Sequence, residues 1–279
     1  MILIGDSGST KTDWALVDRS GSVLEIKTEG TNPFFQTEDQ ICSVIEQSLL
    51  PQLTRDVKLS EIHFYGAGCG FEDKILMVRK ALGKYLTVSG EICVSTDMLA
   101  AARALCKHSE GIACILGTGS NSCHYDGEEI VKNVSPLGFI LGDEGSGAVL
   151  GKLFIGNILK NQFPEHLKAE FLDEYAITPA DIIDKVYRQP FPNRYLATFS
   201  PFILKHLYVP EVRGMVYKSF VDFITRNVCQ YKLHLPVHFV GSVAYYYQDI
   251  LREVLSLHRF ETGIILKSPM QGLIEFHQQ

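Results

Sequence analysis

The pattern that most constrains this chain occurs twice, about 110 residues apart. Each copy begins with an apolar strand and continues through a short turn rich in Gly, Ser and Thr into a second strand, a hairpin turn and a third strand. The first turn is Gly5–Thr12 and the second is Gly117–Asn121. A repeat of this length predicts two similar halves. The alternative is a chance likeness of two glycine turns, because short glycine-rich matches are weak signals.

The segments that follow each copy alternate between helix-like and strand-like patterns, which predicts an α/β fold. The polar segment Lys107–Gly111 separates the two copies and marks the expected boundary. We therefore expect one domain over 1–108 and a second over 109–268, with the last helix, 269–279, as a segment that could return to the first domain. The sequence predicts strands at 61–65, 91–94, 237–240 and 263–266, and helices that include 38–50, 73–82, 98–107, 145–159 and 212–233.

Composition narrows the classes of function. The 279 residues are 46% hydrophobic, which allows a large core, and the formal net charge is −6. No Lys/Arg-rich run is present, so nucleic acid is not an expected partner. The apolar stretches are too short to cross a bilayer, and the first residues lack the pattern of a signal peptide, so we expect neither a signal peptide nor a membrane partner. Seven cysteines without a C-x-x-C pair predict reduced, buried thiols in a cytoplasmic protein that acts on a small molecule.

The first glycine turn has the chemistry of a phosphate site. Glycine lets backbone N–H groups approach an anion closely, and Ser and Thr hydroxyls add donors. Asp6 at the end of the strand suits Mg²⁺ held through water, and Lys11 could neutralise phosphate charge. The turn is not a Walker A loop, because it lacks G-x-x-x-x-G-K-[ST] and a strand follows it. The alternative is an ordinary hairpin with a solvated Asp and Lys.

The second turn, Gly117–Asn121, has the same chemistry without the acid. Two such turns that face each other could clamp a triphosphate from both sides. That pairing distinguishes this arrangement from a Rossmann site, in which one glycine turn opens a helix.

Asp97 lies between the strand predicted at 91–94 and the helix that begins at Met98. A carboxylate there points out of the carboxyl end of the sheet, where open α/β folds place their ligands. Such a carboxylate could accept the proton of an attacking hydroxyl. The alternative is that Ser95, Thr96 or Asp97 only caps the helix.

Two further glycine motifs open helices in the second half. Gly142–Gly147 contains Asp143 and Glu144, whose carboxylates could accept hydrogen bonds from substrate hydroxyls or only interact with the helix dipole. Gly241–Ala244 follows a strand and could pack beneath an adenine or only allow tight strand-to-helix packing.

These motifs, in this order, resemble the N-acetylglucosamine kinase group of the BadF/BadG/BcrA/BcrD-type ATPase family, within the actin/hexokinase/Hsp70 superfamily. The resemblance spans nearly the whole chain. Its most specific part is Gly117–Asn121 followed about twenty residues later by Gly142–Ser146. It implies two ribonuclease H-like (actin-like ATPase) domains with a nucleotide cleft between them. The other matching motifs are Asp6–Thr12, Gly30–Pro33, Gly66–Gly70, Thr96-Asp97 and Gly241–Val243.

The resemblance also implies a function, which is phosphorylation of N-acetylglucosamine at its 6-hydroxyl with ATP and Mg²⁺, by a homodimer. Asp97 matches the catalytic base of the family, and Asp6 matches the acid associated with Mg²⁺. The remaining matches imply phosphate contacts from Gly8, Ser9, Thr10, Lys11, Thr118 and Gly119, adenosine contacts from Gly241 and Ser242, and sugar contacts from Asn32, Ser120, Asn121 and Asp143.

One departure leaves the acceptor open. The segment Ser135–Gly138 stands where the family has a glycine- and aromatic-rich stretch that helps to line the sugar pocket, so N-acetylmuramic acid and glucosamine are alternative acceptors. A dehydratase-activator ATPase of the same family would need a cysteine-ligated iron–sulfur cluster, and no paired cysteines suit one. A sugar sensor without activity would not need both Asp6 and Asp97. The zinc signature C-x-C-G of ROK kinases is absent, so no zinc is expected.

Overall fold

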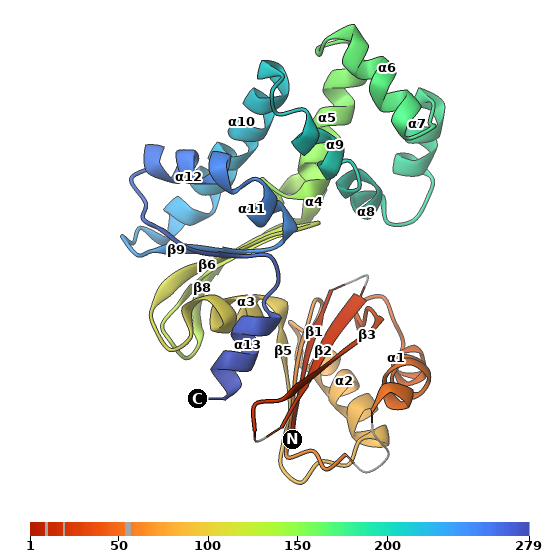
Figure 1. The fold of residues 1–279 in the computed structure, drawn as a ribbon, viewed down its shortest axis with the longest axis vertical. Helices are drawn as coiled ribbons and strands as arrows, with labels where there is room; N and C mark the ends of the chain where they lie inside the picture. Colours follow the sequence, from red (N-terminus) through yellow and green to blue (C-terminus); the bar gives the residue numbers. More distant parts are fainter. Residues whose placement is uncertain (9–10, 19, 54–56, 279) are drawn as a thin grey trace. The chain divides into compact units, whose positions relative to one another are not determined.

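The computed structural model describes residues 1–8, 11–18, 20–53 and 57–278. The chain divides into two compact units (Figure 1). Unit 1 consists of Met1–His108 together with Pro269–Gln279, and unit 2 consists of Ser109–Ser268. In the described ranges, no helix is both long enough and apolar enough to cross a membrane.

Unit 1 is built on a five-stranded sheet with the order β3-β2-β1-β4-β5. Strand β1 pairs antiparallel with β2 and parallel with β4. Figure 1 shows α1 and α2 on one side of this sheet and α3 and α13 on the other. The strands are β1 Ile2–Ser7, β2 Lys11–Val17, β3 Val23–Glu29, β4 Glu61–Gly66 and β5 Ile92–Thr96, and the helices are α1 Glu38–Val44, α2 Glu72–Tyr85, α3 Asp97–Cys106 and α13 Met270–His277.

The period-two alternation of strand side chains gives each face of this sheet its own core. Leu3, Trp14 and Phe64 pack on the α1 and α2 side. Ile4 and Ala15 pack on the α3 and α13 side. Residues two positions away from Ile4 and Ala15 on the same strands therefore also lie on the side of the sheet that faces α3.

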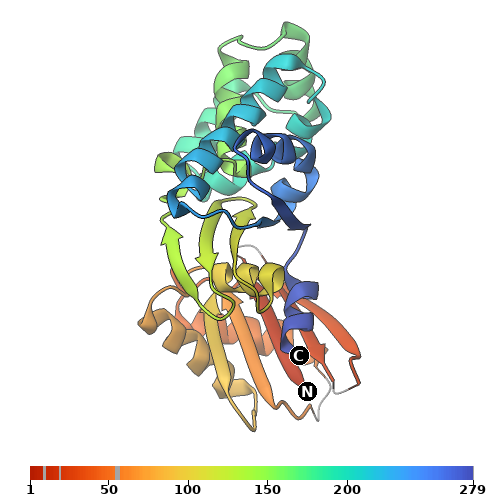
Figure 2. The same ribbon diagram turned by 90° about the vertical axis from the view of Figure 1, so that its left-hand side faces the viewer.

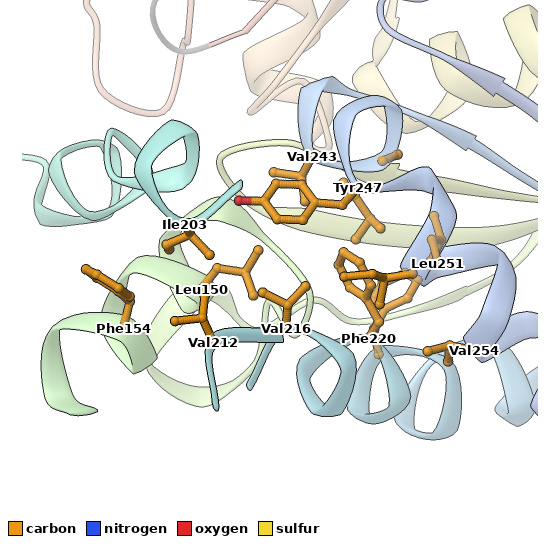
Figure 3. Packing of buried hydrophobic residues seen from close by; sticks show 14 of the residues in the cluster. Leu150, Phe154, Ile203, Val212, Val216, Phe220, Val243, Tyr247, Leu251 and Val254 are labelled. Atoms are coloured by element: carbon orange, nitrogen blue, oxygen red, sulfur yellow. The ribbon is translucent and has the colours of Figure 1, made fainter. Parts of the chain in front are cut away.

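Unit 2 has a five-stranded sheet with the order β10-β9-β6-β7-β8, and its helices from α5 to α12 lie on one side of that sheet (Figure 2). One large core joins the sheet to these helices. Figure 3 shows Phe220 of α10 packed toward Tyr247 and Leu251. The strands are β6 Gly111–Leu116, β7 Ser120–Tyr125, β8 Ile130–Val134, β9 Val237–Val240 and β10 Thr262–Leu266. The helices are α4 Gly138–Leu141, α5 Gly147–Leu159, α6 Glu165–Glu174, α7 Pro179–Tyr187, α8 Pro192–Ala197, α9 Ser200–Lys205, α10 Pro210–Arg226, α11 Ser242–Tyr246 and α12 Gln248–Leu257.

The predicted repeat is confirmed. The orders β3-β2-β1-β4-β5 and β8-β7-β6-β9-β10 are the same arrangement, with the first strand of each half at the centre. In both units the glycine turn joins the central strand to its antiparallel neighbour. The cysteines are free thiols, as predicted, and most are buried, but Cys93 and Cys229 are only half-buried.

Two predicted helices are shorter than expected. The helix predicted at 212–233 ends at Arg226, and a 3₁₀ turn follows at Val228–Tyr231. At this end, the carbonyl of Phe223 accepts from both the backbone N–H of Asn227, over 2.9 Å, and its side-chain nitrogen, over 3.2 Å. The helix predicted at 38–50 becomes a π turn at Ile45–Leu49 before Leu50–Gln52, where a proline ends the regular ladder.

Candidate active site

The first glycine turn connects β1 to β2, where Ser7 and Thr12 form the last ladder pair. Their hydroxyl oxygens lie 2.7 Å apart, and the N–H of Thr31 donates to Ser7 Oγ over 2.9 Å. The N–H of Gly8 donates to the carbonyl of Lys11 over 3.0 Å. Ser9 and Thr10, two of the predicted phosphate contacts, lie outside the described residues. The buried hydroxyls of Ser7 and Thr12 thus hold the base of the turn.

Asp6 is the next-to-last residue of β1 and lies on the α3 face of the sheet. It is paired across the antiparallel ladder with Asp13, and directly opposed like charges repel. Burial raises the pKa of Asp6 from its ordinary 3.8 to about 7, and the charges of Asp97 and Asp13 add to this, while Lys11 opposes it. A nearby cation would stabilise the ionised form of a carboxyl with such a raised pKa.

Asp13 was missed by the sequence analysis, although it shares the face of Asp6. The Lys11 ammonium lies 2.6 Å from Asp13 Oδ2, so the lysine that was predicted to meet phosphate pairs with this acid. The other oxygen, Asp13 Oδ1, is buried and has no hydrogen-bond partner among the described residues. The period-two spacing of Asp13 from the buried Ala15 was the signal that could have identified it.

Asp97 is the first residue of α3 and follows β5 at the same sheet edge as the end of β1. The capping role belongs to Thr96, whose hydroxyl accepts from the N–H of Leu99 over 3.2 Å. Burial raises the pKa of Asp97, and the backbone N–H of Met98 partly offsets this. Thr96 therefore caps the helix in place of Asp97. The Asp97 carboxyl, with its raised pKa, remains at the carboxyl end of the sheet as a possible proton acceptor.

Asn32 is buried in the turn that follows β3, at the same edge. Its side-chain oxygen accepts from the N–H of Phe34 over 3.0 Å, and its own N–H donates to Gln36 Oε1 over 2.6 Å. Gly68, in the loop after β4, has φ +84° and lies against the Asn32 carboxamide, where a Cβ would collide. Unit 1 thus gathers Asp6, Asp97 and Asn32 at one edge of its sheet.

In unit 2, the second glycine turn is fixed by backbone hydrogen bonds. The N–H of Gly147 donates to the carbonyl of Gly117 over 2.8 Å, and that of Ala148 donates to Thr118 over 3.0 Å. Helix α5 begins at Gly147, and Ser146 caps it by accepting from Val149. The turn and the start of α5 therefore form one rigid piece.

Asp143 lies against this turn. Its Oδ1 accepts from the N–H of Ser120 over 3.3 Å, and Gly119 is so close that a Cβ there would lie 3.2 Å from Oδ2. Burial raises the pKa of Asp143 to about 6, the Ser120 N–H lowers it, and the charge of Glu144 raises it further. Asp143 is therefore ionised near neutral pH and can accept a hydrogen bond from a ligand hydroxyl.

The Asp143 backbone has φ +54°, a conformation that few non-glycine residues adopt. The buried Glu144 beside it is held from α10, because it pairs with Arg226 and accepts from Asn227 Nδ2 over 3.3 Å. The N–H of Gly145 also donates to Ser219 Oγ over 3.1 Å. Helix α10 thus anchors the loop that carries Asp143, a role that no local sequence signal indicated.

The other residues predicted in unit 2 lie around the same turn. Asn121 is half-buried on β7, and its side-chain oxygen accepts from Asn133 Nδ2 over 2.8 Å and from its neighbour Ser122 over 2.9 Å. Gly241, at φ +125°, lies so close to Leu116 that a Cβ would collide with the Leu116 carbonyl. This close approach is the tight packing that the sequence allowed, and it brings the exposed Ser242 to the base of the turn.

The acids of unit 1 fit a magnesium ion bound mainly through water and phosphate. Among the described residues, no three His, Cys, Asp or Glu side chains come close enough to coordinate a metal. Mg²⁺ characteristically needs only one or two carboxylates beside waters and substrate phosphates. The raised pKa of Asp6 and the unpaired Oδ1 of Asp13 both indicate a place where a cation would be stabilised.

Comparison with known proteins places these features in a family. A sequence model described as the BadF/BadG/BcrA/BcrD ATPase family matches residues 5–208. Two solved structures, each described as a putative N-acetylglucosamine kinase, resemble this chain over nearly the full length of both chains. The one from Porphyromonas gingivalis is 53% identical, with a TM-score of 0.96, and covers 100% of this chain and 99% of its own. The one from Chromobacterium violaceum is 19% identical, with a TM-score of 0.68 and coverages of 100% and 98%.

A ROK family glucokinase from Streptomyces griseus, solved with glucose and AMPPNP, is 17% identical with a TM-score of 0.57, and the match covers 99% of this chain and 97% of that one. This likeness bears on the fold alone, and it agrees with the predicted pair of actin-like α/β domains. The search of curated proteins found no match.

Proposed function

Since the chain belongs to the BadF/BadG/BcrA/BcrD ATPase family, we propose that it is a kinase that transfers the γ-phosphoryl group of ATP to an amino sugar, with the 6-hydroxyl of N-acetylglucosamine as acceptor. The name of the 53% identical structure supports this acceptor. The observation that carries the proposal is Asp97, a carboxylate of raised pKa at the same sheet edge as Asp6. We assign the two ATPase domains to 1–108 with 269–279 and to 109–268.

The nucleotide would be held by both glycine turns. Backbone N–H groups and hydroxyls of the first turn (Gly8, Ser9, Thr10) and of the second (Thr118, Gly119) are the proposed phosphate donors. The Lys11 ammonium, which pairs with Asp13, would also contact the phosphate and offset part of its negative charge. The adenosine would lie against the loop of Gly241 and Ser242, which abuts the second turn.

Asp6, opposite Asp13, would hold Mg²⁺ through water. When bound, the ion supplies charge neutralisation on the β- and γ-phosphate oxygens. The cation also offsets the repulsion between the Asp6 and Asp13 carboxylates.

The sugar would be oriented by hydrogen bonds from Asn32, Ser120, Asn121 and Asp143. Asp97 accepts the proton of the 6-hydroxyl as the hydroxyl oxygen forms a bond to the γ-phosphorus. The bond from that phosphorus to the β–γ bridging oxygen breaks, and ADP leaves with the electron pair. Positioning supplies most of the rate enhancement, since the phosphoryl group needs little covalent help from the protein.

The proposal is tested by a coupled assay of ADP release with N-acetylglucosamine, N-acetylmuramic acid, glucosamine and glucose, each with Mg²⁺ and ATP. We expect N-acetylglucosamine to give the highest kcat/KM and the product to carry phosphate on its 6-oxygen. ADP release in water alone provides the background. If no sugar raises the rate above this background, the kinase proposal is wrong.

We also propose the cytoplasm as the site of action. ATP is the proposed co-substrate, and the buried thiols of Cys42, Cys69 and Cys106 suit a reducing compartment.

A further inference from the structure

Three phenylalanines of unit 1 are exposed together beside Asn32. The exposed fractions are 56% for Phe34, 69% for Phe35 and 61% for Phe71. The ring centroid of Phe34 lies 6.1 Å from that of Phe35 and 6.0 Å from that of Phe71. Large aromatic side chains that gather on a surface mark a binding site more often than isolated ones do. We call Phe34, Phe35 and Phe71 the aromatic platform.

The platform is fixed to the proposed sugar site by short contacts. The N–H of Phe34 donates to the side-chain oxygen of Asn32 over 3.0 Å, and the N–H of Phe35 donates to the Asn32 carbonyl over 3.0 Å. On the other side, a Cβ on Gly68 would lie 3.4 Å from Phe34 Cβ, so the loop after β4 packs against the same turn. These contacts hold the backbone of Phe34 and Phe35 directly against Asn32, the residue proposed to bind the sugar.

The chemistry of the platform differs from what the ring of a sugar requires. Sugar hydroxyls need hydrogen-bond partners, which the proposed polar residues Asn32 and Asp143 offer, whereas phenyl rings offer only apolar contact and a π face. An N-acyl group on the sugar has both a methyl group and a planar amide. Resting on aromatic faces would remove its apolar surface from water.

We propose that the aromatic platform binds the N-acyl substituent of the amino sugar, and that it selects N-acylated sugars over free amines. This inference rests on the proposed sugar kinase function and names the part of the acceptor that unit 1 recognises. Because Phe35 is 69% exposed, the platform is open on its outer side. It therefore accepts acyl chains longer than acetyl.

The test measures kcat/KM for glucosamine, N-acetylglucosamine and N-propionylglucosamine with the wild type and with Phe34→Ala and Phe71→Ala. Loss of the apolar contact should lower kcat/KM for both acylated sugars by about 5- to 20-fold. It should change kcat/KM for glucosamine less than about twofold and leave the KM for ATP unchanged. Phe34→Leu, which keeps an apolar side chain, should lose less than Phe34→Ala.

Tyr187→Ala is the matched control, because Tyr187 is an exposed aromatic residue of unit 2. It should leave all three sugars unaffected. Thermal unfolding checks that each variant is folded, as expected for changes at exposed side chains.

Several outcomes would overturn the inference. An equal loss for all three sugars would mean that the platform only supports Asn32. A raised KM for ATP would mean that the rings meet the nucleotide, and a change in oligomeric state would mean that they contact a second copy. If the wild type phosphorylates none of the sugars but binds N-acetylglucosamine more tightly than glucosamine in calorimetry, the kinase proposal fails while the platform stands. If it neither phosphorylates nor binds them, both fail.

Discussion

The two halves of the chain share a sheet order but differ in charge at matching positions. In unit 1, the ladder pair one step before the turn is Asp6 opposite Asp13. In unit 2, the corresponding pair is Ile115 opposite Asn121. The same backbone therefore presents two acids in one half and no charge in the other. The comparison indicates that unit 1 carries the charge chemistry of the proposed reaction.

The two halves also hold their glycine turns differently. The first turn is tied at its base by the hydroxyls of Ser7 and Thr12. The second is tied by backbone hydrogen bonds to the start of α5 and, through Glu144, to α10. We expect the anchored loop of unit 2 to position the sugar through Asp143. Changes at the acids Asp6 and Asp97 of unit 1 should then act mainly on kcat, and changes in the anchor of unit 2 should act mainly on KM.

The largest effect is expected from Asp97→Asn. The amide keeps the shape but cannot accept the proton of the acceptor hydroxyl, so kcat for sugar phosphorylation should fall by about 10³- to 10⁴-fold. ATP affinity, measured by calorimetry, should stay within about twofold, because Asp97 contacts the acceptor in this proposal. Near-normal turnover would refute the assignment of the base. Asp73→Asn, at an exposed acid of α2, is the control and should be neutral.

Asp6→Asn should lower kcat by about 10²- to 10³-fold, because the carboxylate that holds Mg²⁺ is lost. The concentration of Mg²⁺ that gives half-maximal rate should rise in the same variant. Asn121→Ala in unit 2 should leave that Mg²⁺ concentration unchanged, since its ladder position carries no charge. An equal shift in both variants would break the contrast between the two halves.

Arg226→Met tests the anchor of unit 2. Removing the guanidinium leaves the buried Glu144 without its ion pair, so the loop of Asp143 loses its fixed position. The KM for the sugar should rise by about 5- to 10-fold, while kcat changes less than about threefold. Arg213→Met is the control, because Arg213 lies on the same helix in an exposed pair with Glu253. A fall in kcat at unchanged KM would show that the anchor acts on the chemical step.

Much of this arrangement could be predicted because its signals are local. The repeat appears as two glycine turns, and Asp97 appears as an acid at a strand-to-helix junction. The anchor could not be predicted in this way. Glu144 meets Arg226 and Asn227 only because α10 returns to the loop, and residues more than 80 positions apart leave no periodic signal. Burial likewise decides the ionisation of Asp6, and burial is a property of the folded sheet.

The smallest expected effect concerns stability without nucleotide or Mg²⁺. The pKa of Asp6 is about 7 in the folded protein against an ordinary 3.8, so between these values the folded state holds a proton that the unfolded chain has released. The free energy of unfolding contributed by this group therefore falls as pH rises from about 4 to about 7. Asp6→Asn removes this dependence, so its Tm relative to the wild type should rise by about 3–6 °C between pH 5 and pH 8, measured with a chelator present.

The matched control for this stability measurement is Asp18→Asn, in the hairpin of the same sheet. Hydrogen bonds from Ser20 and Ser22 lower the pKa of Asp18, so its charge stabilises the folded state above the ordinary pKa and this contribution is lost as pH falls. Its loss should lower Tm at pH 8 relative to pH 3, which is the opposite sign. If the Tm difference of Asp6→Asn did not grow with pH, the pKa of Asp6 would not be raised in the folded protein.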